Sequence, residues 1–138
     1  MNHNLTLAIL PQAYAICRLE PRSEVPAWAR GESFFSITRT AHELSVVCED
    51  QSVPAGVHAE RNRRLLRIEG TLAFSLTGIL AFIAEPLAAA GISIFAVSTY
   101  DSDYLLVAAE DLHRTTAVLE AAGHTIFTDT NISRSSAE

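Results

Sequence analysis

The residues best suited to ligand chemistry begin with a loop that opens into a helix in the second half of the chain. Residues 75–80 read SLTGIL, and the apolar residues that follow have helical spacing. The first amides of a helix have no partner within the helix and carry partial positive charge, so they attract carboxylates. Gly78 permits close approach to the backbone, and Thr77 adds a hydroxyl donor. This segment therefore predicts a carboxylate-binding site.

A second polar group follows an apolar stretch further along the chain. Residues 94–104 read IFAVSTYDSDY, so a predicted strand ends in Ser98 and Thr99 and is followed by a turn that contains Asp101 and Asp103. A carboxylate with neighbouring hydroxyls suits an ammonium group. If the helix start and this turn face each other, they form a partly dry cleft for a small zwitterion, with its carboxylate on the helix and its ammonium on Asp103.

The same residues also fit a chain without a ligand. In that alternative Thr77 only caps the helix, Gly78 makes a tight turn, and the aspartates are ordinary hairpin residues. Other reactive types carry weaker signals. The metal-ligand types of the first half lack the spacing of a metal site, although they include Cys17, His42, Cys48 and His58. A triad can be assembled only from common types, namely Ser98, His113 and Asp103.

We therefore expect no metal, no cofactor and no catalytic residue. Nucleotide-binding glycine motifs are absent from the sequence. Four basic side chains near the middle of the chain form a patch that we interpret as a solvated face or an interface, with an anion partner as the alternative: Arg61, Arg63, Arg64 and Arg67.

Length and composition limit the classes of protein. With 138 residues, 49% hydrophobic and 19% charged, the chain fits one ordinary domain or two small ones and is not disordered. The net charge of -6 argues against nucleic-acid binding and against anionic membranes. No apolar run reaches the roughly 18 residues needed to span a bilayer, and the first residues do not resemble a signal peptide. We expect a cytoplasmic protein with free cysteines.

The elements that must position these residues follow from periodicity. In the second half the pattern predicts strand, helix, strand, strand, helix, strand, over residues 63–69, 78–90, 92–98, 104–109, 111–122 and 124–128. The wholly apolar segment 92–98 is expected to be a central buried strand. This order is typical of an α+β, ferredoxin-like βαββαβ fold, in which both helices cover one face of a four-stranded antiparallel sheet.

The first half predicts mainly short strands. These cover residues 5–10, ending at Pro11, then 14–19, 34–39 and 44–49, with a helical turn near Trp28. We interpret this half as a degenerate copy of the same unit, with the two sheets joined edge to edge. The predicted organisation is a degenerate unit over residues 1–60, a complete unit over 61–130 and a polar tail over 131–138.

One long segment makes the chain resemble a known family. Residues 68–108, and most specifically the tract GISIFAVSTYDSDYLLV at 91–107, resemble ACT-domain proteins. They look like the small bacterial tandem-ACT proteins related to aspartate kinase regulatory domains and to CASTOR-type sensors. The first half matches more loosely, through residues 5–7, the turn at Trp28 and the strand at 34–40.

The resemblance implies tandem βαββαβ ACT units that pair into a continuous sheet and bind amino acids at the interface between units. By position, it places Leu76, Thr77, Gly78 and Ile79 at the ligand carboxylate. It places the remaining site residues near the amino or side-chain end, and these are Ser98, Thr99 and Asp103. The first half has no second Thr-Gly-Ile-Leu motif, so a single site per chain is expected.

The predicted function is therefore a non-catalytic, amino-acid-binding regulatory or sensor protein. We expect it to be a homodimer whose ligand shifts interface packing or the binding of an unidentified protein partner. The alternative is a structural dimerisation or interaction module with no ligand. A small enzyme is a third possibility, and it would need an activated nucleophile or a metal.

Overall fold

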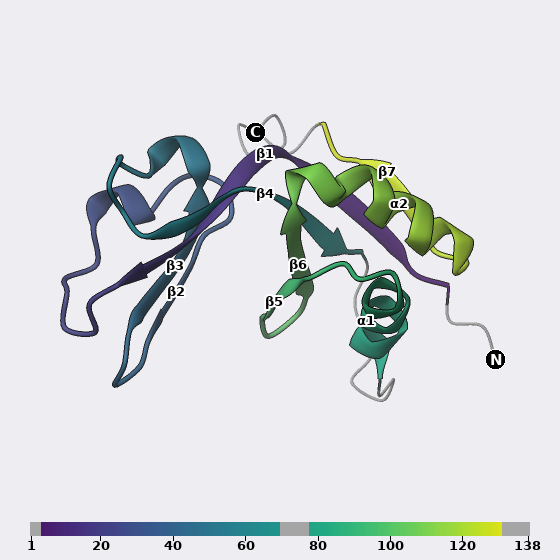
Figure 1. The fold of residues 1–138 in the computed structure, drawn as a ribbon, viewed down its shortest axis with the longest axis horizontal. Coiled ribbons are helices and arrows are strands. Elements are labelled where there is room, and N and C mark those ends of the chain that lie inside the picture. The colour runs from purple at the N-terminus through teal and green to yellow at the C-terminus, as the bar shows by residue number, and fades with distance from the viewer. Residues whose placement is uncertain (1–3, 70–77, 131–138) are drawn as a thin grey trace. The chain divides into compact units, whose positions relative to one another are not determined.

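The computed structural model describes residues 4–69 and 78–130, which form two compact units (Figure 1). Unit 1 comprises residues 1–11 and 64–138, and unit 2 comprises residues 12–63. Two long strands, β1 (Thr6–Leu19) and β4 (Ala59–Ile68), pass from one unit into the other. No helix in the described part of the chain combines the length and the hydropathy that crossing a membrane requires.

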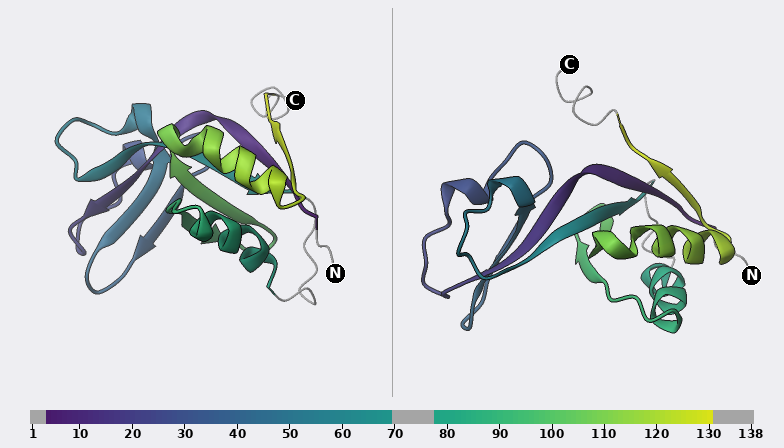
Figure 2. Two further views of the ribbon diagram at one scale, coloured as in Figure 1. Left: turned by 45° about the vertical axis from the view of Figure 1, so that its right-hand side comes forward. Right: turned by 45° about the horizontal axis from the view of Figure 1, so that its top comes forward.

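Unit 1 contains the βαββαβ order that the sequence predicts. After β4 come α1 (Ile79–Ala89), β5 (Phe95–Ser98), β6 (Asp103–Ala108), the short 3-10 helix η3 (Ala109–Asp111), α2 (Leu112–Ala121) and β7 (Thr125–Thr128). Figures 1 and 2 show α1 and α2 on one face of the unit 1 strands, as expected. The α+β, ferredoxin-like assignment is confirmed for this unit.

The sheet of unit 1 is not the predicted four-stranded antiparallel sheet, because the start of β1 is inserted into it. Residues Thr6–Ile9 of β1 pair in parallel with Thr125–Thr128 of β7. On its other side β1 lies next to β4, where the Glu69 amide donates to the Thr6 carbonyl at 2.8 Å. The order is therefore β7-β1-β4-β6-β5. Strands on both sides explain why Leu7–Leu10 are all buried.

Strand β1 also continues through Pro11, where the sequence predicts an end. Proline lacks an amide donor, but its backbone fits an extended strand wherever no ladder bond is needed. Pro11 lies between the residues that pair with β7, which end at Ile9, and those that pair with β3, which begin at Tyr14. The missing amide therefore costs this side of the strand no ladder hydrogen bond.

Strand β5 contradicts the prediction of a central buried strand. It pairs with β6 and is the last strand of the sheet on that side. Phe95 remains 37% exposed, and Ala96 and Ser98 are exposed. An apolar run in a sequence indicates that the segment is stabilised by burial. It does not indicate whether other parts of the same chain or another molecule bury it.

Two glycines in left-handed conformations mark the ends of α1. Gly78 is the N-cap with φ 81°, and Gly91 follows the C-terminus with φ 75°. The Ile92 amide then closes the helix end by donating to the Leu87 carbonyl at 2.9 Å, as in a Schellman motif. Asp111 is the N-cap of α2. Its side chain makes no capping bond and instead accepts from Arg114 at 3.2 Å.

Unit 2 contains part of β1 together with β2 (Ser36–Arg39), β3 (Leu44–Glu49) and the start of β4. The predicted strands at 34–39 and 44–49 form the antiparallel β2–β3 hairpin, and the Thr40 amide closes its turn by donating to the Glu43 carbonyl at 2.9 Å. The predicted helical turn near Trp28 is the 3-10 helix η1 (Ala27–Ala29), and η2 (Asp50–Ser52) follows β3. The described residues of unit 2 include no α-helix, so they give a tandem of two βαββαβ units no support.

Each unit has its own apolar core. In unit 1 the buried cluster consists of large aliphatic residues: Leu7, Ile9, Leu66, Ile68, Ile83, Leu87, Ile92, Leu105, Val107 and Leu119. In unit 2 the cluster is built mostly from small ones: Ala15, Cys17, Ala29, Leu44, Val46, Cys48 and Val53.

Candidate functional site

The β5–β6 hairpin brings the three predicted residues of the strand end together. Ser98 and Asp103 are register partners, and the Ser98 hydroxyl donates to Asp103 Oδ1. Thr99 closes the turn, because its amide donates to the Ser102 carbonyl at 2.8 Å and its Oγ1 accepts from the Ser102 amide at 3.1 Å. Asp103 is thus a carboxylate held at the end of a hairpin in unit 1.

The start of α1 provides the second half of the predicted site. Gly78 is exposed, and its carbonyl accepts the first helical bond, from the Phe82 amide at 3.2 Å. No described side chain caps this end of the helix. Ile79 is only 7% exposed, so it can contribute its backbone amide and little of its side chain. Leu76 and Thr77 lie outside the described residues.

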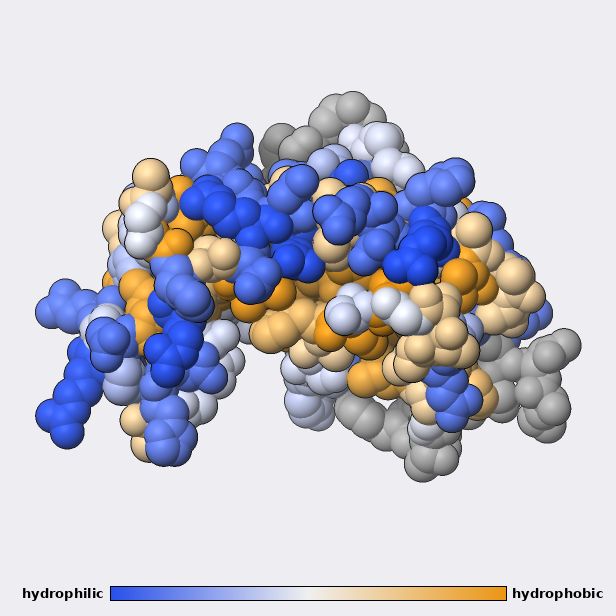
Figure 3. Space-filling model, in the orientation of Figure 1, coloured by the Kyte–Doolittle hydropathy of each residue, from blue (hydrophilic) through white to orange (hydrophobic). Residues whose placement is uncertain are grey.

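The two segments lie toward the same end of unit 1 in Figure 1 and in the left view of Figure 2. Helix amides supply donors, and Asp103 with Ser98 supplies acceptors, so the chemistry is that of binding a polar small molecule. Their surroundings are apolar, since Phe95 and Ala96 of β5 are exposed. Figure 3 shows further apolar surface over α1.

The residues proposed for other chemistry do not assemble into a reactive centre. Ser98 donates to Asp103, and no described hydrogen bond joins His113 to either residue. Within residues 4–69 and 78–130, no group of three or more His, Cys, Asp and Glu side chains can hold a metal.

The two cysteines are buried neighbours in the core of unit 2. The register places Cys48 opposite Ala15 and Cys17 opposite Val46, so the two thiols lie diagonally across one face of the β1–β3 pair. A hydrogen bond from the Cys48 thiol lowers the pKa of Cys17. That same bond and burial raise the pKa of Cys48. These thiols pack as small apolar residues.

The arginine patch makes its contacts within the chain, and three of its four side chains have a carboxylate partner. Arg61 pairs with Asp50 at 3.1 Å, and Arg63 pairs with Glu60 at 2.9 Å. Arg64 donates to the Leu10 carbonyl at 3.0 Å.

Arg67 is the most strongly engaged of these arginines. It pairs with Glu69 at 2.5 Å and with Asp129 at 3.1 Å. Partial burial lowers the pKa of Arg67, but the hydrogen bonds to these two carboxylates outweigh burial and raise it. The described contacts therefore favour a solvated, ion-paired face over an anion site.

Comparison with known protein families identifies two matching segments of the chain. The ACT domain family matches residues 58–121, and a family described as an N-terminal domain matches residues 12–56. Residues 58–121 of this chain are an ACT domain. No curated protein is significantly similar to it in sequence.

Several solved structures share the fold of this chain. Protein Atu0741 of Agobacterium tumefaciens is 41% identical, with 93% of this chain and 96% of that chain covered and a TM-score of 0.89. The VC0802 protein of Vibrio cholerae, described as a possible transport protein, shares the fold at 20% identity, 87% and 91% coverage and a TM-score of 0.72. The regulatory subunit of aspartate kinase from Thermus thermophilus shares it at 10% identity, 84% and 96% coverage and a TM-score of 0.59. The fold is thus one that regulatory subunits use.

Proposed function

We propose that this ACT-domain protein is a non-catalytic regulatory protein that binds an amino acid at the start of α1 and the β5–β6 hairpin of unit 1. The proposal is supported by a glycine-led helix start that no described side chain caps, together with a carboxylate at the end of the hairpin. Helix amides favour the α-carboxylate of an amino acid, and Asp103 favours its ammonium. Ser98 orients Asp103, and Thr99 holds the turn.

The exposed edge of β5 supports a dimer as the working form. An edge strand presents unpaired backbone groups, and an apolar one is stabilised by a partner strand. Phe95 and Ala96 lie on this edge, directly before Ser98. A second copy of the chain that pairs there would cover the edge and enclose the ligand between two unit 1 sheets. A ligand that binds this dimer more tightly than the monomer then shifts the equilibrium between them.

A thermal-unfolding screen over the natural amino acids tests the proposal. At a ligand concentration one hundred times its dissociation constant, the native state gains about 2.7 kcal/mol. Asp103→Asn should abolish this gain. Asp101→Asn removes the same charge two residues away on the exposed turn and should retain it. Flat melting curves with every amino acid, or equal loss in both variants, would overturn the proposal.

A second matched pair tests the helix start. Gly78 and Gly91 both have positive φ, and a Cβ at either meets nothing within 4 Å. Alanine at each position therefore carries a similar backbone cost of about 1 kcal/mol. Only Gly78→Ala should weaken amino-acid binding, as measured by the same screen. Equal affinities for the two variants would remove Gly78 from the site.

The alternative is a structural module without a ligand. It is favoured by one observation: Ser98 satisfies Asp103, and Thr99 satisfies Ser102, so the hairpin is stable by itself. In that case Asp103→Asn changes no cellular or binding readout, whereas Phe95→Lys dissociates the dimer in analytical ultracentrifugation.

A further inference from the structure

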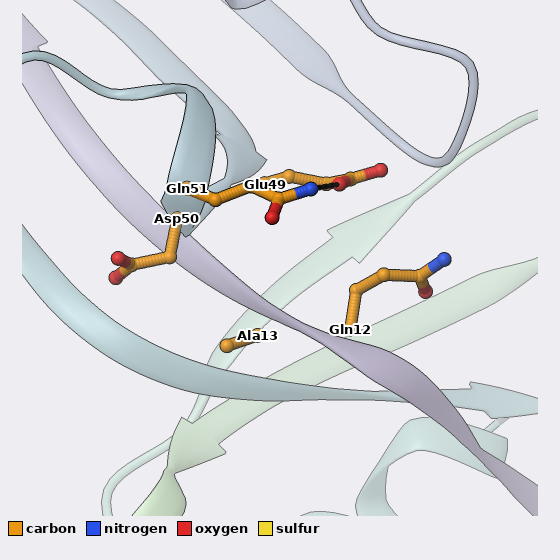
Figure 4. Close-up of a pocket in the computed structure, with 5 residues that line it drawn as sticks. All are labelled: Gln12, Ala13, Glu49, Asp50 and Gln51. Carbon is orange, nitrogen blue, oxygen red and sulfur yellow. Dashed lines mark hydrogen bonds between the residues drawn. The ribbon is translucent and has the colours of Figure 1, made fainter.

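Unit 2 has a pocket that the proposed amino-acid site does not use. Its volume is about 220 Å³, and its lining residues are Gln12, Ala13, Glu49, Asp50 and Gln51 (Figure 4). Strand β1 contributes the first two residues, and the end of β3 with the following 3-10 helix contributes the others. All of them belong to unit 2.

The side chain of Glu49 is fixed by hydrogen bonds to both of its carboxylate oxygens. Gln51 Nε2 donates to Glu49 Oε1 at 3.0 Å, and the Ser33 hydroxyl donates to Glu49 Oε2. Ser33 in turn accepts from the hydroxyl of Tyr14 at 3.2 Å, and Tyr14 is fully buried. Neutral donors thus position the carboxylate before any ligand arrives, and each oxygen keeps a further lone pair for another donor.

The negative charge of Glu49 has no counter-ion among the described residues. The other carboxylate of the pocket, Asp50, is already engaged, since it accepts from Arg61 at 3.1 Å and from the Asn62 amide at 2.7 Å. Figure 4 shows the Asp50 side chain turned away from Gln12, whereas Glu49 and Gln12 extend toward the same side. The pocket therefore presents one uncompensated charge next to an amide.

We propose that this pocket binds a small organic cation that carries a primary ammonium or guanidinium group, with Glu49 as its ionic partner. Such groups present several N–H donors to one carboxylate, and Gln12, which also lines the pocket, has an amide oxygen that can accept another. The volume corresponds to about seven water molecules at ~30 Å³ each, which suits a short diamine or an aminoalkyl guanidine. This proposal does not rest on the amino-acid site, because the residues belong to the other unit.

Titration with agmatine and cadaverine, monitored by ¹H–¹⁵N NMR at physiological salt, tests this site. Neither probe has a carboxylate, so neither satisfies the predicted amino-acid site of unit 1. The amide signals of residues 12–14 and 49–51 should shift and saturate, while those of residues 98–103 stay unchanged. Glu49→Gln should weaken binding roughly tenfold or more. Glu24→Gln removes the same charge from an exposed position of unit 2 and should leave affinity unchanged.

A third variant keeps the proposal testable if Glu49→Gln fails to fold. Gln12→Glu adds a second carboxylate to the pocket lining and should tighten binding of both probes severalfold. Absence of saturable shifts would overturn the proposal. So would equal affinities in Glu49→Gln and Glu24→Gln, or shifts that MgCl₂ reproduces at the same concentration, because these results indicate an adventitious charge effect.

Discussion

The two units reach stability by different means. Unit 1 buries large aliphatic side chains under two helices, whereas unit 2 has small core residues, no described α-helix and a network of polar contacts near its surface. In unit 2, Arg39 donates to the carbonyls of Pro21 and Ser23, and Asp50 joins η2 to β4 through Arg61. A small apolar core leaves more of the fold to hydrogen bonds, which contribute less per contact than a fully buried leucine.

This difference predicts that truncating a core side chain lowers the free energy of unfolding more in unit 1 than in unit 2. Leu105 is fully buried in the unit 1 cluster, so Leu105→Ala should lower the free energy of unfolding by about 2–5 kcal/mol in urea denaturation. Val46→Ala in unit 2 removes two carbon atoms rather than three, and we expect a loss of about 1–2.5 kcal/mol. If Val46→Ala lowers the free energy of unfolding as much as Leu105→Ala or more, the two cores do not differ as proposed.

A buried polar side chain of unit 1 should give the next largest effect. His124 is 6% exposed; its Nδ1 accepts from the Leu5 amide at 3.0 Å, so its Nε2 carries the proton and donates to the Phe82 carbonyl at 3.1 Å. His124→Leu removes both bonds and should cost about 1–3 kcal/mol. His113→Leu, on the exposed face of α2, is the control and should change the unfolding free energy by less than about 0.5 kcal/mol.

The smallest effect is expected at Asp50 of unit 2. Burial raises the pKa of this carboxyl, but hydrogen bonds from the Asn62 amide and from Arg61 outweigh burial and lower it. A carboxyl whose pKa is lower in the folded state stabilises the fold above its unfolded pKa, near 4, and loses that contribution as the pH falls. Asp50→Asn should therefore cost less than about 1 kcal/mol at pH 7. The difference from the parent should shrink toward pH 3.

Unfolding curves at both pH values measure that change. Glu24→Gln, which removes an exposed carboxylate of the same unit, is the matched control and should change the unfolding free energy at pH 7 by less than about 0.5 kcal/mol. An Asp50→Asn deficit that grows as the pH falls would contradict the direction of the pKa shift.

Local patterns in the sequence were sufficient where neighbours along the chain determine structure. Apolar spacing and two glycines specify α1, and a threonine-led turn specifies the β2–β3 hairpin. They failed where strands distant in sequence decide the outcome. Nothing near Thr6 indicates that β7 will pair with it in parallel, and nothing within residues 92–98 indicates an edge strand.

The residues of the two candidate sites differ in the same respect: some were predictable from the local sequence, and others were not. Gly78 and Asp103 stand in a motif that the sequence already indicates. Glu49 does not, because it is one of many acidic residues, and the network that fixes it comes from Ser33 and Tyr14, far away along the chain. Sequence carried no signal for that pocket.

By itself, the amino-acid sequence determined the order of elements in unit 1, the ends of its helices and the family resemblance, since each depends on residues close together along the chain. The tertiary structure alone decided that β1 continues through Pro11, that β5 forms an edge, and that Glu49 lines a pocket with no counter-ion among the described residues. Strand pairing and charge compensation are contacts between distant residues, and their energies appear only once the chain has folded.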